Sequence, residues 1–190
     1  MLDFDLAQPT SAEIMSIKLQ ESEILEYLNA SHTVRGFFIT SVDIFEQLIQ
    51  MLIERVFLKN DFAVQSVVGP LLNGSGPLAD LSVRLKLLFG LGVIPNAIYH
   101  DVDNIVKLKN SLTNDSKEYH FTDTSIVDSI KSLYLAKNMN LDMFNPIEEN
   151  KESDLFFYNM QVDRQQQVIK SSLALAIISL CEALNKESPF

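Results

Sequence analysis

The chain has 190 residues, 47% of them hydrophobic and 21% charged, and this amount of apolar material excludes a chain that is disordered as a whole. Acidic residues outnumber lysine and arginine by 25 to 15, which gives a formal net charge of −10. A DNA-binding surface depends on clustered basic residues, so this balance argues against a molecule that rests on DNA with most of its surface.

Helical periodicity begins near the N-terminus. Thr10, with Glu13 three residues later, is typical of a helix start, and the apolar face that follows predicts a helix ending near Ala30. Residues 37–58 are apolar on nearly every side. A helix of that kind belongs at the centre of a bundle, so we expect residues 37–58 to form the central buried helix.

Turn residues divide the middle of the chain into three further helices. Residues 60–72 predict a third helix, with asparagine and aspartate at its capping positions. Residues 73–77 form a glycine-containing turn, whose proline suits the first position of a fourth helix that reaches Leu91. The proline of a second turn, at residues 92–96, opens a fifth helix that ends near Leu112.

The last third of the chain is more polar. Residues 113–121 predict a polar connector, after which Asp123 caps a sixth helix that ends near Ala136. Residues 138–154 are rich in asparagine, glutamate and aspartate and predict a polar loop. Residues 161–186 predict a long final helix.

These elements together predict the fold class. Alternation with a period of two is hard to find, so we expect an all-α fold: a single-domain, multi-helix bundle with a central apolar helix, covering residues 1–190. The apolar stretch before the C-terminus is shorter than the roughly 20 residues of a membrane span. The acidic N-terminus lacks the basic and apolar regions of a signal peptide. We therefore expect a cytoplasmic protein with no membrane segment.

The sequence lacks the residue patterns that are typical of enzymes and of metal or cofactor sites. Residues 74–79 match the form G-x-G-x-x-A, but a dinucleotide-binding motif follows a strand, and the preceding residues predict a helix. His32, His100 and His120 lack the spacing of metal ligands. Cys181 lies in an apolar run and is expected to be a buried, unreactive thiol. We predict no enzyme, and no catalytic, cofactor-binding or metal-binding residues.

Three charged residues stand in the apolar fourth helix: Asp80, Arg84 and Lys86. Residues four apart share one face of a helix, so Asp80 and Arg84 are predicted to form an ion pair that braces the bundle. The alternative is an exposed Arg84 that meets a carboxylate or phosphate of a partner. These three residues are the candidates for structural or partner-contact roles.

Residues 87–109 resemble a helix-turn-helix, the motif whose second helix enters the major groove of DNA. The early residues of that second helix include His100, Asp101 and Asp103. Two carboxylates in that position would face the phosphates and repel them. A corner between two packed helices is therefore the favoured interpretation.

Residues 70–94, with the sequence PLLNGSGPLADLSVRLKLLFGLGVI, closely resemble the signature of the mannitol operon repressor (MtlR) family, which includes shorter YggD-like proteins. Residues 99–126 extend the resemblance, through a Tyr-x-Asp start and the later run Phe121-Thr122-Asp123. The similarity is strongest over residues 66–126.

The resemblance implies an all-α protein that negatively regulates the genes of mannitol uptake and metabolism, with no catalytic residues to carry over. Because the chain is acidic, we favour a transcriptional repressor that acts through protein–protein contact. Its partner would be a DNA-binding regulator or a component of a sugar phosphotransferase. The alternative is a repressor that binds DNA directly through residues 87–109. A helical bundle that senses a small molecule is a third hypothesis, and a homodimer stays open.

Overall fold

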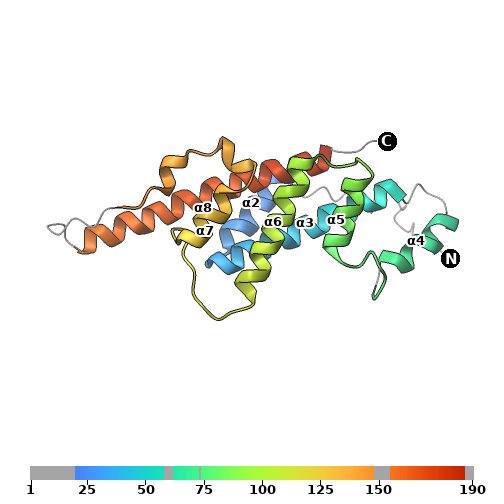
Figure 1. The fold of residues 1–190 in the computed structure, drawn as a ribbon, viewed down its shortest axis with the longest axis horizontal. Coiled ribbons are helices and arrows are strands. Elements are labelled where there is room, and N and C mark those ends of the chain that lie inside the picture. Colours follow the sequence, from blue (N-terminus) through green and yellow to red (C-terminus); the bar gives the residue numbers. More distant parts are fainter. Residues whose placement is uncertain (1–19, 58–61, 73, 148–154, 187–190) are drawn as a thin grey trace, which may run out of the picture.

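The computed structural model describes residues 20–57, 62–72, 74–147 and 155–186 (Figure 1). In chain order, the elements are α2 (Glu21–Ala30), α3 (Val34–Phe57), α4 (Phe62–Leu72), α5 (Leu81–Gly90), α6 (Asn96–Thr113), α7 (Thr124–Lys131), the short 3-10 helices η1 (Leu135–Asn138) and η2 (Leu141–Phe144), and α8 (Leu155–Lys186). The described residues contain no strand. The prediction of an all-α bundle is confirmed.

Helix α3 lies at the centre of the bundle and packs against α2, α5, α6 and α8. Figure 1 shows α5 and α6 crossing it steeply, while α8 runs along the length of the molecule. Helix α3 begins at Val34 because the Thr33 hydroxyl accepts the Gly36 N–H at 3.0 Å and caps the first turn. Its largest fully buried side chains are Phe37, Phe38, Phe45, Ile49, Leu52 and Ile53. The prediction of a central apolar helix is confirmed.

Helix α8 has 32 residues and begins at Leu155, earlier than the predicted start at residue 161. By length and composition alone, α3 and α8 would each be able to span a membrane, so the expectation that the C-terminal apolar stretch is too short was wrong. A buried core helix passes the same test, and the apolar residues of α3 lie in the core. The second half of α8 also packs inward, through Leu173, Ile177 and Leu184.

The fourth helix begins later than the turn proline predicted. Helix α5 starts at Leu81, because the Asp80 carboxylate accepts the N–H groups of Ser82 at 2.7 Å and Val83 at 3.2 Å. The preceding turn folds back over the end of α4, where the Leu78 N–H donates to the Leu71 carbonyl at 2.9 Å. A side-chain cap, rather than proline, therefore sets the start of α5.

The predicted sixth helix is divided, since α7 ends at Lys131 and η1 follows after a short turn. The polar segment after it is not a simple loop, because η2 places Phe144 in the core. The fifth helix agrees closely with its prediction, as α6 begins one residue after Pro95. The predicted start of the first helix, near Thr10, and the expected cap at residues 60–61 lie outside the described residues.

We predict that Gly76→Ala destabilises the protein by about 2 kcal/mol, because the added methyl group overpacks the turn. A Cβ at Gly76 would lie 2.3 Å from the Leu71 carbonyl oxygen and 2.5 Å from that of Pro70, both backbone atoms. Gly90→Ala is the control, since a Cβ there meets nothing within 4 Å. Thermal and urea unfolding would measure both variants. Equal melting temperatures for the two would show that the turn does not need glycine at residue 76.

Candidate functional site

The guanidinium of Arg84 joins α5 to the central helix. Arg84 is 4% exposed, and its Nη2 donates to Glu46 Oε1 at 2.7 Å while its Nη1 donates to Gln50 Oε1 at 2.6 Å. Glu46 is itself half exposed. The carboxylate that pairs with Arg84 therefore comes from α3, across a helix–helix interface.

The predicted ion pair between Asp80 and Arg84 was wrong. Asp80 lies at the cap of α5 in an extended conformation, with φ −78° and ψ 129°, and its carboxylate is used by the first-turn N–H groups. The four-residue spacing brings side chains together only when both residues are helical. Lys86, the third candidate, is exposed on α5.

Helices α5 and α6 form a packed corner at the segment that resembles a helix-turn-helix. Helices α5 and α6 contact each other, and the rings of Phe89 and Tyr99 stack across the corner with their centroids 4.5 Å apart. The buried face of α6 packs against α3. The glycine that permits the turn is Gly92, which has a positive φ of 71°.

The sequence predicted that Asp101 faces outward, toward DNA phosphates, but the residue is buried. It is 2% exposed, and its two carboxylate oxygens accept the N–H groups of Tyr134 at 2.7 Å and Leu135 at 2.8 Å. These bonds fix the chain between α7 and η1 against α6. Asp103 forms an ion pair with Lys107, one turn further along α6.

A polar cleft lies where the turn between α2 and α3 meets residues 117–121 and α8. It consists of two hollows of 310 and 290 Å³ that share His32, Phe121 and Gln166. Helix α8 also contributes Gln167 and a carboxylate, Asp163, to the smaller hollow. The sequence predicted the connector at 113–121 but gave no sign that it lines a cleft.

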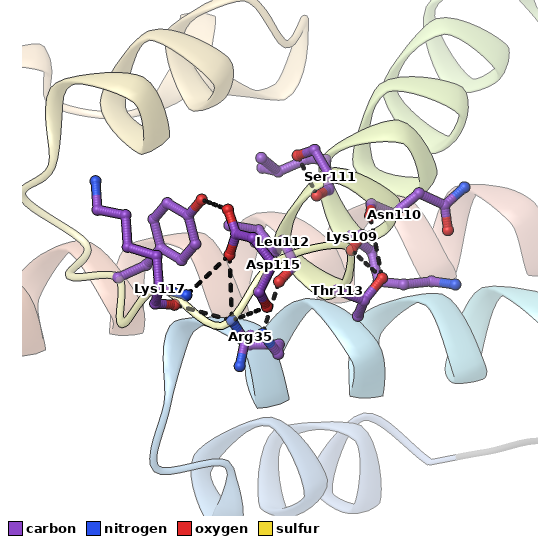
Figure 2. A network of polar contacts seen from close by, with 10 residues as sticks. Arg35, Lys109, Asn110, Ser111, Leu112, Thr113, Asp115 and Lys117 are labelled. Atoms are coloured by element: carbon purple, nitrogen blue, oxygen red, sulfur yellow. Dashed lines mark hydrogen bonds and ion pairs between the residues drawn. The ribbon is translucent and has the colours of Figure 1, made fainter.

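Arg35 holds one wall of this cleft in place (Figure 2). Its Nε donates to the Leu112 carbonyl at 2.7 Å, and its Nη2 donates to the carbonyls of Asp115 at 3.0 Å and Lys117 at 2.8 Å. The carboxylate of Asp115 lies 3.5 Å from the same Nη2. The hydrogen bond from the Tyr119 hydroxyl, at 2.7 Å, is the main cause that lowers the pKa of Asp115.

Lys170 of α8 holds the opposite wall. Its ammonium donates to the carbonyls of Asn29 at 3.0 Å and Ser31 at 2.6 Å, which lie at the C-terminal end of α2. Partial burial lowers the pKa of Lys170. Arg35 and Lys170 were not singled out by the sequence, because backbone carbonyls far along the chain are partners that no motif announces.

The described residues hold no group of three or more histidine, cysteine, aspartate or glutamate side chains that is placed to bind a metal ion. Cys181 is buried, as predicted, and burial raises the pKa of its thiol to about 12. A thiol with that pKa stays protonated at neutral pH and is a poor nucleophile.

Residues 20–185, most of the chain, match the family model of the mannitol repressor. The chain belongs to the mannitol repressor family. The mannitol operon repressor of Escherichia coli K12 is 38% identical over 170 residues, which cover 90% of this chain and 85% of that protein. A second relative, named fumarase E, from Shigella flexneri, is 27% identical over 167 residues, covering 87% of this chain and 97% of that one.

Two solved structures resemble the fold. The E. coli MtlR chain, solved as an MtlR–HPr complex, is 39% identical with a TM-score of 0.79, and the match covers 86% of this chain and 97% of that chain. YggD of S. flexneri, described as a possible transcriptional regulator, is 26% identical with a TM-score of 0.72 over 88% and 98%. The resemblance seen at residues 66–126 thus extends over most of the mannitol repressor fold.

We predict that Arg84→Ala lowers the free energy of unfolding by about 2 kcal/mol, because it removes a buried side chain and its hydrogen bonds to Gln50 and to the half-exposed Glu46. A double-mutant cycle with Glu46→Gln should give a coupling energy of about 1 kcal/mol. The same cycle with Asp80→Ser, which keeps a capping hydroxyl, should give less than about 0.5 kcal/mol.

Urea unfolding of the single and double variants would measure these energies. A larger coupling energy between Arg84 and Asp80 than between Arg84 and Glu46 would support the ion pair that the sequence predicted. An Arg84→Ala variant that melts like the parent yet fails to repress would instead make Arg84 a contact residue.

Proposed function

We propose that this chain represses the genes of mannitol uptake and metabolism through protein–protein contact, and that its partner is an HPr protein. The observation that carries this proposal is the relative solved in complex with HPr, which matches this chain over 97% of its own length. A partner of that kind is in keeping with a cytoplasmic location, which we also propose.

The electrostatics of the chain support a mechanism without direct reading of DNA. The net charge is −10, and the only helix that resembled a reading helix, α6, turns one face toward α3. Lys107, a basic residue that would reach a phosphate, is paired with Asp103. Counterion release by basic side chains supplies much of the affinity of proteins for DNA, so a chain of this composition needs a partner to hold it at an operator.

We further propose that the exposed face of α5 takes part in the protein contact. Val83, Lys86 and Phe89 lie three residues apart on this helix, and all three are exposed. The exposed apolar side chains Val83 and Phe89 could lie at the apolar centre of a contact, with Lys86 on its polar rim. Asp80 and Arg84 then keep structural roles, as the cap of α5 and its link to α3. Whether the chain also forms a homodimer stays a prediction for sedimentation analysis.

We predict that the pure protein binds HPr but does not bind its operator with a dissociation constant near 10⁻⁸ M, roughly the affinity of specific DNA-binding proteins. Isothermal titration would measure HPr binding, and operator titrations over a salt series that includes about 0.15 M would measure DNA binding. Lys86→Glu should weaken HPr binding about tenfold, roughly 1.4 kcal/mol.

Lys137→Glu is the charge-matched control for this experiment, because Lys137 is exposed on η1 rather than on α5. Specific operator binding by the pure protein, lost on mutation of Asn96 or His100, would establish the direct DNA-binding alternative. Equal effects of the two lysine substitutions would remove α5 from the contact.

The relatives named fumarase E favour a second candidate function, a fumarate hydratase. We propose that this chain is not an enzyme, because the family model and the 38% identical relative are both named as mannitol repressors, whereas the relatives named fumarase E are 27% identical. The absorbance of fumarate, followed with the pure protein, should show no change above a no-protein control. Turnover that is lost in a variant of one cleft residue, such as His120→Gln, would overturn this expectation.

A further inference from the structure

The polar cleft has the size and shape of a small-molecule site. Its two hollows, of about 310 and 290 Å³, adjoin at the side chains that they share, His32, Phe121 and Gln166. Sites for small ligands are concave and begin at about 300 Å³. None of the residues that line the cleft belongs to α5, so the cleft is separate from the exposed face of that helix.

The lining offers hydrogen-bond donors and acceptors in mixture. Glu118 and Asp163 only accept, Lys117 only donates, and Gln166 and Gln167 do both. A site for a bare anion would exclude carboxylates, whereas a hydroxyl group donates and accepts at once and suits a mixed lining. The polar groups therefore favour a ligand with several hydroxyl groups.

An aromatic ring borders both hollows and is fixed by the core. Phe121 is buried, and its ring meets the ring of Phe37 edge-on with centroids 5.5 Å apart. Only 6% of Phe121 is exposed, so its ring gives the cleft a narrow apolar border beside the polar groups. A carbon chain that bears a hydroxyl on each carbon matches both.

The walls are held before a ligand arrives. Arg35 fastens residues 112–117 to the start of α3, and Lys170 fastens the end of α2 to α8. A site whose walls are already fixed loses less conformational entropy on binding. Lys117 lies along the larger hollow beside the carboxylate of Glu118, so the two charges there are balanced.

We propose that this cleft binds a small polyhydroxylated ligand, a sugar alcohol or its phosphate ester. The choice of a sugar alcohol rests on the proposed function in mannitol regulation, while the polyhydroxylated class rests on the lining of the cleft. Binding there would give the repressor a direct signal of the compound whose genes it controls.

Isothermal titration of the full chain with mannitol, mannitol 1-phosphate, inorganic phosphate and fumarate tests the proposal. We expect a dissociation constant below about 1 mM for mannitol or its phosphate, which is modest for a ligand of this size. Gln166→Leu should weaken binding at least about tenfold, because Gln166 borders both hollows. Gln161→Leu, on the same helix but outside the cleft, should leave binding unchanged.

Glu118→Gln provides a second cleft variant, on a different segment, and circular dichroism would check that each variant is folded. Failure of both polyols to bind would overturn the proposal. So would inorganic phosphate or fumarate binding as tightly as mannitol 1-phosphate, since the hydroxyl chain would then contribute nothing. HPr binding by the same preparation separates the ligand hypothesis from the partner hypothesis. A protein that binds HPr but no polyol overturns only the proposed ligand. A protein that binds a polyol but not HPr overturns only the proposed partner.

Discussion

The structure depends on the burial of α3, a helix that is apolar on nearly every side. Such a helix is stable only when other helices cover its apolar faces, and α2, α5, α6 and α8 do so, while Asp43, Glu46 and Gln47 remain exposed. Each fully buried large apolar side chain contributes about 1.5–3 kcal/mol relative to its exposed state, so the covering helices are bound to α3 mainly through this burial. The buried polar side chain of α3 itself, Ser41, donates its hydroxyl to the Phe37 carbonyl within the same helix at 2.8 Å.

Two arginines connect the covering elements to α3, and they do so in different ways. Arg84 reaches α3 from α5 and finds side-chain acceptors, whereas Arg35 reaches out from α3 and binds backbone carbonyls at the end of α6. The hydrogen bonds offset part of the cost of burial: Arg35 stays about one third exposed, and the buried Nε of Arg84 has no hydrogen-bond partner among the described residues. Such contacts contribute more to the geometry of the bundle than to its net stability, because desolvation offsets much of the attraction.

The fold was largely predictable and the site was not, for a common physical reason. The central helix follows from an unbroken local run at residues 37–58, and the fifth helix from a local turn. The error at Arg84 arose because spacing along one helix was used to choose its partner, while capping placed Asp80 outside that helix. Asp101 was misplaced because its acceptor role depends on Tyr134, which is brought to it only by the tertiary fold. The cleft could not be foreseen, since its walls come from segments that each resemble ordinary solvated chain.

The two proposed surfaces share α3 as their common support. The cleft lies at the first turn of α3, through Val34 and Arg35, while α5 is fixed near the middle of α3, through Glu46 and Gln50.

A ligand that binds only the folded state raises the free energy of unfolding. Once the ligand concentration exceeds the dissociation constant, this stabilisation grows with the logarithm of their ratio. In the cleft, that stabilisation would act on the attachment of α2, α8 and residues 117–121 to the start of α3. A signal to α5 would have to pass through α3 or α6, which both contact α5, and α3 is the most completely buried helix of the described bundle. The physical arrangement therefore favours a ligand that modulates the stability and rigidity of the repressor over one that rearranges its partner surface.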